Sequence, residues 1–387
     1  MDFELTPEQK SLQEEAQAFA AAEFDPAYAM RCEQDRRYPS DLRQKAGTRG
    51  LLAVYIPREY GGRGLGLLES VLVIEAMCRK DPGLGMALSL ASLGTPVTLR
   101  YGSEEQKRTI LPRVAAGEIM TGIALTEPGH GSDLTDVATT ATRTSSGYVV
   151  EGRKTLISNG QNARYVTLLC KTDPEARPPH RGLSLILLDT NRPGYKASDL
   201  GLKMGMRMMS TAEISLQGVK VPASNLIGME NRGFYHTLEF LNESRIEVAA
   251  QALGDAEAAF DRALARVKER RQFGKRLADL QVTQHKIADM ATKIETARLL
   301  TYMAAWQSDQ GGSDPVQASM AKLHAARVAV EVAEEAIQLF GGYGYFLENE
   351  VERIYRDARV TEIYEGTREI QKNTIARYLL GSWREEA

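Results

Sequence analysis

The feature that most constrains the fold is a change in hydrophobic periodicity along the chain. Beyond about residue 230, apolar residues recur every three or four positions, which predicts long helices with one buried face. One stripe runs through residues 246–267. A second runs through 323–340, follows a helix start at Asp314-Pro315 and ends at Gly341-Gly342. The many alanines in both stripes favour closely packed antiparallel helices.

Short β-rich runs fill the middle of the chain. Residues 148–150, 165–169, 183–188 and 214–216 are rich in Val, Leu, Ile and Tyr, and turn residues such as those at 158–160 separate them. The first ~115 residues before them have a helical pattern, beginning with a Thr cap and Pro at positions 6 and 7. The pattern therefore predicts an α+β multidomain chain: a helical domain, a β-domain and a helical bundle.

Composition excludes several classes of function. A net charge of −3 gives no drive towards nucleic acid or anionic membranes, and no apolar run reaches the length of about 20 residues that a membrane helix needs. Three separated cysteines without a CxxC pair signal neither a zinc site nor a redox dithiol, so we expect no metal. The acidic start has no secretory signal, and we expect a cytoplasmic protein, or a mitochondrial matrix protein if a presequence was removed.

Two glycine-rich segments and a basic segment have residues suited to binding. The loop at 124–134 offers hydroxyl and backbone N–H groups that could contact a ring or a phosphate, although any Gly/Ser loop could look similar. The paired arginines at 270–271 could clamp a pyrophosphate or simply solvate a helix end. The three glycines within 341–344 exceed what a helix stop needs and permit close approach of a backbone or ligand.

One carboxylate stands in a suggestive place near the end of the chain. Glu365 follows an Ile-Tyr pair and precedes Gly366-Thr367, just before a new helical segment. Such a carboxylate could face a cavity, although a solvated acid at a helix start is the commoner fate of an isolated Glu.

These four segments, in this order and spacing, resemble the acyl-CoA dehydrogenase family over essentially the full chain. Residues 124–133 resemble its first signature, and 338–348 with Arg353 and Asp357 resemble its second. Residues 363–367 are similar to the segment of its catalytic base, and 270–274 to its adenine-dinucleotide clamp. The resemblance implies a helical domain at 1–119, a β-barrel-like domain at 120–227 and a four-helix bundle at 228–387.

The resemblance also implies FAD as the cofactor and a homo-oligomer, usually a tetramer in which a neighbour holds part of each FAD. The residues expected around the flavin ring are Ile123, Leu125, Thr126, Gly131, Ser132, Leu156, Ile157 and Ser158. Those expected at a neighbour's dinucleotide are Arg270, Gln272, Phe273, Leu280, Gln281, Gln338, Gly341 and Gly342, while Thr367 and Glu369 would meet the cofactor near the base.

The implied reaction is the α,β-dehydrogenation of an acyl-CoA to the trans-2-enoyl-CoA. Glu365 would remove the α-proton, flavin N5 would accept the β-hydride, and an electron-transferring flavoprotein would reoxidise the flavin. Burial would raise the basicity of the carboxylate, and the Glu365 N–H with a ribityl hydroxyl would hold the thioester carbonyl. The substrate contacts implied by the resemblance are Ser132, Asn242, Arg245, Tyr364 and Gly366.

Some positions depart from the family pattern or leave alternatives open. Leu156 stands where an aromatic residue usually meets the flavin, and Ser244 occupies a rival base position but cannot serve as a base. Gly85 argues against a dicarboxylic substrate. The acyl tail stays open, in a pocket expected near Ser89 and Ser92. An acyl-CoA oxidase, an acyl-carrier-protein dehydrogenase and a non-catalytic helical scaffold are the alternative functions.

Overall fold

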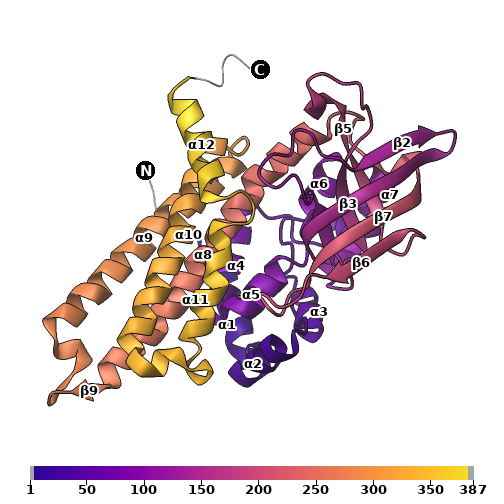
Figure 1. Ribbon diagram of the computed structural model, residues 1–387. Helices are drawn as coiled ribbons and strands as arrows, with labels where there is room; N and C mark the ends of the chain where they lie inside the picture. Colours follow the sequence, from indigo (N-terminus) through magenta and orange to yellow (C-terminus); the bar gives the residue numbers. More distant parts are fainter. Residues whose placement is uncertain (1–3, 382–387) are drawn as a thin grey trace.

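The structure, a computed structural model, describes residues 4–381 and has the predicted order of helices, sheet and helices. The first part consists of α1 (Pro7–Glu23), α2 (Pro26–Asp35), α3 (Ser40–Thr48), α4 (Leu67–Lys80), α5 (Pro82–Ser89), α6 (Thr95–Tyr101) and α7 (Glu104–Ala115). Figure 1 shows the sheet on one side of the molecule and the long helices on the other, with α4 and α5 between them. The predicted fold class is confirmed.

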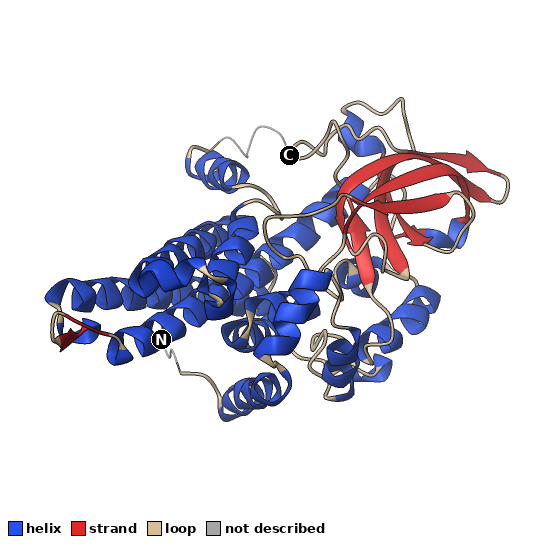
Figure 2. Cartoon of the chain, turned by 60° about the horizontal axis from the view of Figure 1, so that its bottom comes forward, coloured by secondary structure: helices blue, strands red, loops and turns tan. Residues whose placement is uncertain are grey.

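One curved sheet forms the middle of the chain (Figure 2). Its strands are β1 (Thr121–Ala124), β2 (Thr140–Thr144), β3 (Gly147–Ser158), β4 (Tyr165–Lys171), β5 (Leu183–Asp189), β6 (Tyr195–Asp199), β7 (Thr211–Pro222) and β8 (Leu226–Ile227). Their order is β6-β7-β3-β2-β4-β5-β8, and β1 pairs in parallel with β4. Buried and less buried residues alternate along most of β7, as expected for a strand with one face on a core.

The last part contains α8 (Gly233–Glu269), the short hairpin β9 (Arg271–Gln272) and β10 (Lys275–Arg276), then α9 (Gln281–Asp309), α10 (Pro315–Phe340), α11 (Val351–Ala358) and α12 (Arg368–Leu379). Helices α8, α9 and α10 pack on one another, and α12 packs on α10. The predicted helix at 315–340 is confirmed: Asp314 caps its first turn, and Gly341 ends it at φ +64°.

Two polar contacts join the first helices to the last ones. The Asp309 carboxylate, at the end of α9, accepts hydrogen bonds from the backbone amides of Leu67 and Leu68 at 2.7 and 3.0 Å and so caps α4. The buried Arg353 guanidinium of α11 pairs with Asp81, the cap of α5, at 2.6 Å. The two ends of the sequence therefore share one core, in which α4 also packs along α8.

No helix within residues 4–381 combines the length and the apolar composition required to cross a membrane. The domain boundaries at 119/120 and 227/228 stay a prediction, because packing alone does not define them.

Candidate functional site

The loop between the 3₁₀ turn Arg359–Glu362 and α12 carries Glu365 in an unusual backbone conformation. Glu365 has φ +53° and Gly366 φ +96°, so two successive residues lie in the left-handed region. Thr367 then caps α12 by accepting a hydrogen bond from the Ile370 amide at 3.4 Å. A left-handed conformation is costly for a residue with a side chain and persists only where surrounding contacts impose it.

Three side chains from other elements impose this conformation through the loop's carbonyl groups. Arg245 of α8 and Gln371 of α12 donate to the Glu365 carbonyl oxygen at 3.3 and 3.2 Å. Lys322 of α10 donates to the Gly366 carbonyl at 2.7 Å, and Gln371 donates to the same oxygen at 2.8 Å. We refer to residues 363–367 held in this way as the base loop.

The carboxylate of Glu365 takes no part in these bonds. Its Oε2 atom is buried and has no hydrogen-bond partner among residues 4–381. Burial raises the pKa of Glu365, while the Ser244 hydroxyl and the cations of Arg245 and Lys322 act in the opposite direction. A buried carboxyl group with a raised pKa and a free oxygen is chemically suited to accept a proton.

The surroundings of the base loop include further polar groups. The amide of Glu365 has no acceptor among the described residues, so it is available to a ligand. The Tyr364 hydroxyl donates to Gln251, whose amide donates to Ser89 at 2.9 Å. This chain of hydrogen bonds links the base loop to α5.

Arg245 and Asn242 lie beside the base loop, as expected for the predicted substrate contacts. Arg245 is buried, and its guanidinium donates to the Asn242 side chain at 3.3 Å. Arg245 forms no ion pair with its α8 neighbours Glu243 and Glu247 within the described chain. Glu243 pairs with Arg100 instead, and its side chain is 20% exposed.

The residues predicted around the flavin ring gather where β1 meets the C-terminal end of β3. The Thr155 amide donates to the Thr126 carbonyl at 3.0 Å, which brings the first flavin segment beside Leu156. Leu156 has φ +58° and is 64% exposed, so it offers an apolar side chain to a ligand at this position. Ile123, Leu125 and Ile157 have buried side chains, and only their backbone could meet a ligand.

The rest of the predicted flavin segment is more open. Gly131 and Ser132 are exposed, and no atom lies within 4 Å of a Cβ built on Gly131. Asn159 directly follows Ser158, and its side-chain amide donates to the carbonyls of Leu90 and Thr121 at 2.8 and 3.2 Å. Leu90 directly follows Ser89, so the flavin segment and the base loop are both linked by hydrogen bonds to the end of α5.

A second group of predicted cofactor residues lies at the far end of α8. Five of them, Arg270, Gln272, Gln338, Gly341 and Gly342, line one cavity of about 490 Å³ together with aromatic residues such as Tyr343. Phe273 is 94% exposed at φ +51° beside it. Leu280 and Gln281 begin α9 outside the cavity lining.

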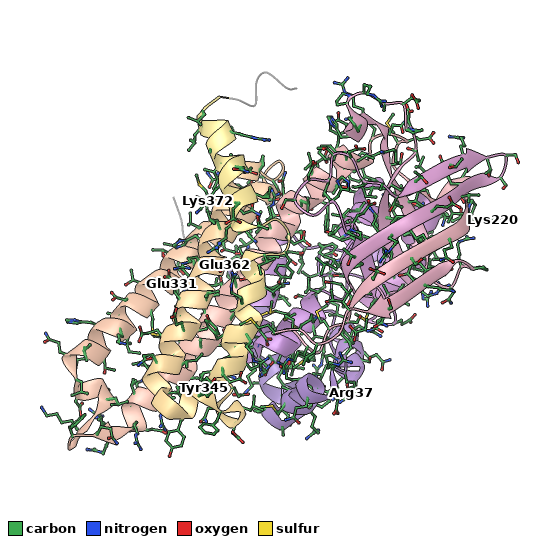
Figure 3. The ribbon with its side chains drawn as sticks, in the orientation of Figure 1. Arg37, Lys220, Glu331, Tyr345, Glu362 and Lys372 are labelled. Atoms are coloured by element: carbon green, nitrogen blue, oxygen red, sulfur yellow. The ribbon has the colours of Figure 1, made fainter. Side chains whose placement is uncertain are left out.

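These two predicted cofactor groups are far apart within one chain. Arg245 and Arg270 are both at α8, 25 residues apart, which corresponds to roughly 38 Å along the helix axis. Figure 3 shows Tyr345 at the lower end of the bundle and Glu362, just before the base loop, well above it. Thr367 and Glu369 lie with the base loop, and Glu369 has a 69% exposed side chain.

The sequence did not reveal Lys322 and Gln371 as part of the site. Both are fully buried and bind backbone carbonyls, contacts that depend on how α10 and α12 pack. A usable signal existed for Lys322, because it lies four residues from Ala318 and Ala326 on the apolar stripe, where a lysine needs a buried partner. No group of three or more metal-binding side chains occurs within residues 4–381.

Comparison with known proteins identifies the family of the chain. The family profiles for the N-terminal, middle and C-terminal domains of acyl-CoA dehydrogenases match residues 6–118, 122–219 and 231–380. An acyl-CoA dehydrogenase of Bacillus subtilis is 40% identical over 97% of this chain and 99% of its own length. The acryloyl-CoA reductase (NADH) of Anaerotignum propionicum is 40% identical over 98% and 96%.

Solved structures identify the same family. The butyryl-CoA dehydrogenase of Megasphaera elsdenii matches with a TM-score of 0.94 and 37% identity, covering 98% of this chain and 100% of that one. A chain from a study of the electron transferring flavoprotein of Acidaminococcus fermentans matches with a TM-score of 0.94 and 38% identity over 98% and 100%. The protein therefore belongs to the acyl-CoA dehydrogenase family, whose members are FAD-dependent oxidoreductases that act on CH–CH bonds.

Proposed function

We propose that the protein dehydrogenates an acyl-CoA thioester to its trans-2-enoyl product, with Glu365 as the base that removes the α-proton. The observation that carries this proposal is the buried, unpartnered Oε2 atom of Glu365 on a backbone held in the left-handed region. The rigid base loop would keep the carboxylate at a fixed distance from the substrate's α-carbon.

The residues around Glu365 suit this step in two ways. Burial raises the pKa of the carboxyl group and so improves its match to a weakly acidic C–H bond. Arg245 and Lys322 act against that rise, because their positive charges favour the ionised carboxylate, which is the form that accepts a proton. The free amide of Glu365 would donate to the thioester carbonyl as negative charge develops on it. Asn242, Tyr364, Gly366 and Ser132 are the further proposed substrate contacts.

The site's residues fit FAD. The exposed Leu156 would pack on the flavin ring, and the backbone at 123–126 and 157–158 would contact its polar edge. FAD, when bound, supplies the acceptor for the hydride that leaves the β-carbon. The Arg270 cavity would hold the dinucleotide of a neighbouring subunit, which accounts for its distance of roughly 38 Å from the base loop along α8.

A homotetramer is the proposed assembly. Large apolar side chains are exposed along α9 and at the end of α12, among them Val282, Trp306, Leu379 and Leu380. Large apolar side chains left exposed in such numbers favour burial against another protein chain. An electron-transferring flavoprotein is the proposed electron acceptor, in keeping with the context of one related structure.

A Glu365→Gln variant tests the base assignment. It should bind FAD normally and stay yellow, yet acyl-CoA substrates that reduce the wild-type flavin anaerobically should leave its absorbance unchanged. Glu331→Gln, at an exposed ion pair of α10, is the matched control and should be bleached like the wild type. Normal bleaching of Glu365→Gln would show that another group is the base.

The electron acceptor and the thioester carrier need separate measurements. Steady-state turnover with O₂ and with an artificial electron acceptor distinguishes a dehydrogenase from an oxidase. Bleaching by CoA thioesters compared with carrier-protein thioesters distinguishes the two kinds of substrate.

A further inference from the structure

A small cavity between α4, α5 and α8 has a partly polar wall. Its volume is about 20 Å³, and five hydrogen-bonding side chains line it: Tyr55, Ser70, Ser89, Ser92 and Glu247. Aliphatic residues form the rest of its wall. A cavity of this size holds about one water molecule or one hydroxyl group.

The cavity is connected to the base loop through short contacts. Ser89 accepts a hydrogen bond from Gln251 at 2.9 Å, and Gln251 accepts one from Tyr364, the neighbour of Glu365. Glu247 lies three residues after Ser244, which faces the Glu365 carboxyl group, so it is about 4.5 Å farther along the axis of α8. A substrate with its α-carbon at Glu365 would point its tail towards Glu247.

Glu247 has few hydrogen-bond partners for a carboxyl group at the wall of a mostly aliphatic cavity. Its single hydrogen bond among the described residues comes from the Ser70 hydroxyl, at 3.0 Å to Oε1. The pKa of Glu247 is raised to about 7, mainly because the carboxyl group is buried. The nearby charged groups, Glu243 and Glu365, are both acidic and raise it further. The other oxygen of Glu247, Oε2, has no hydrogen-bond partner among the described residues and keeps some accessible surface, so a ligand that reaches the cavity could donate a hydrogen bond to it.

We propose that Glu247 is a specificity-determining residue that selects acyl thioesters with a hydroxyl group on the tail, several carbons beyond the thioester. The inference rests on the proposed function, because it places the tail by the position of Glu365. The Glu247 carboxyl group would bind the substrate hydroxyl through its free oxygen, with Tyr55 or Ser92 as a second partner.

The chemistry of the wall distinguishes a hydroxyl from other tail groups. A carboxylate would be repelled by Glu247 and Glu243, and a methyl group would leave the free oxygen of Glu247 without a partner. An ammonium group would have to give up its hydration in a mostly aliphatic cavity, which costs more for a charge than for a neutral group. A neutral hydroxyl can donate to Glu247 and exchange a second hydrogen bond with Ser92 or Tyr55.

The experiment measures binding apart from turnover. In the FAD-loaded Glu365→Gln protein, calorimetry would give the dissociation constants of 4-hydroxybutanoyl-, 5-hydroxypentanoyl- and 6-hydroxyhexanoyl-CoA and of the three unsubstituted acyl-CoAs. We expect one hydroxylated chain to bind at least about tenfold more tightly than its plain counterpart. A second change, Glu247→Leu, should reverse that preference, Glu247→Gln should keep most of it, and Glu239→Gln, at an exposed site of α8, should leave it unchanged.

The possible outcomes separate this inference from the function on which it rests. If plain acyl-CoAs bleach the wild-type flavin and bind as tightly as every hydroxylated chain, the inference is wrong and the proposed function stands. If no thioester of either series bleaches the wild type, both are wrong. Tighter binding of 5-aminopentanoyl-CoA than of the hydroxylated chains would also overturn the assignment. The comparison within Glu365→Gln needs no change at Glu247, so it is decisive even where the Leu variant does not fold.

Discussion

The Nζ atom of Lys322 lies 2.7 Å from the carbonyl oxygen of Gly366 and donates a hydrogen bond to it. The same ammonium group is one of two cations that lower the pKa of Glu365. A single buried lysine of α10 therefore holds the base loop in place and adjusts the proton affinity of its carboxylate.

Replacing Lys322 with Met should raise the pKa of Glu365. Burial raises this pKa and the charges of Arg245 and Lys322 lower it, so the variant loses one of the two opposing charges. The acid limb of the pH profile of kcat/KM should therefore move to higher pH. Lys293→Met removes a lysine from an exposed ion pair on α9 and should leave the profile unchanged. An unchanged acid limb in the Lys322 variant would show that its charge does not reach Glu365.

Gly366→Ala should disrupt the base loop. Gly366 has φ +96°, and an added Cβ would lie 2.7 Å from the Nε2 atom of Gln371, which holds the loop's carbonyls. We expect kcat to fall about a hundredfold or more as the carboxylate is displaced, with FAD binding retained. Gly201 is a matched control, because it has a similar φ of +100° but no atom lies within 4 Å of an added Cβ. The Gly201→Ala variant should retain full kcat.

Glu247→Gln should make the protein more stable at neutral and alkaline pH. The pKa of Glu247 rises from 4.5 to about 7 on folding, so its contribution to stability is complete below pH 4.5 and is lost as the pH rises through 7. Such a rise corresponds to roughly 3 kcal/mol. The unfolding free energy of the variant minus that of the wild type, from urea titrations of the holoprotein, should increase between pH 5 and 8 by up to that amount. A difference that is independent of pH would contradict the raised pKa.

Asp81→Asn should destabilise the whole chain. Asp81 and Arg353 form a buried ion pair at 2.6 Å, and an asparagine can still cap α5 but leaves the guanidinium without its counter-charge. We expect a loss of about 3–5 kcal/mol in unfolding free energy. Asp261→Asn breaks the exposed pair with Arg79 and should cost at most about 1 kcal/mol. Equal losses in the two variants would mean that burial of the Asp81 pair is energetically unimportant.

Local signals were sufficient to predict much of the fold. Proline at 315 and glycine at 341 mark both ends of α10, and the β-rich runs at 165–169 and 183–188 became β4 and β5. Strands β1, β2, β6 and β8 were not predicted, because they are short or lie at positions where pairing with a neighbour decides the conformation.

The parts of the site that escaped prediction are those set by packing. Glu365 could be proposed as the base from its segment, but its left-handed backbone depends on Arg245 and Gln371, which lie 120 and 6 residues away. The small cavity at Glu247 is lined in part by Ser70, which is 177 residues away in the sequence and hydrogen-bonds to Glu247. No local sequence pattern predicts a contact between residues so far apart. Which residues bind cofactor and substrate stays a prediction until the variants above are measured.

The Asp309 cap on α4 has a consequence for how the protein is made. The amide of Leu67 obtains its partner from a residue 242 positions later in the chain. At a synthesis rate of about 5–20 residues per second, the start of α4 waits roughly 10–50 s on the ribosome for the group that completes it. The apolar face of α4 also packs on α8 and α9, which are made later still than the middle of the chain, so α4 cannot complete its packing until most of the protein has been synthesised.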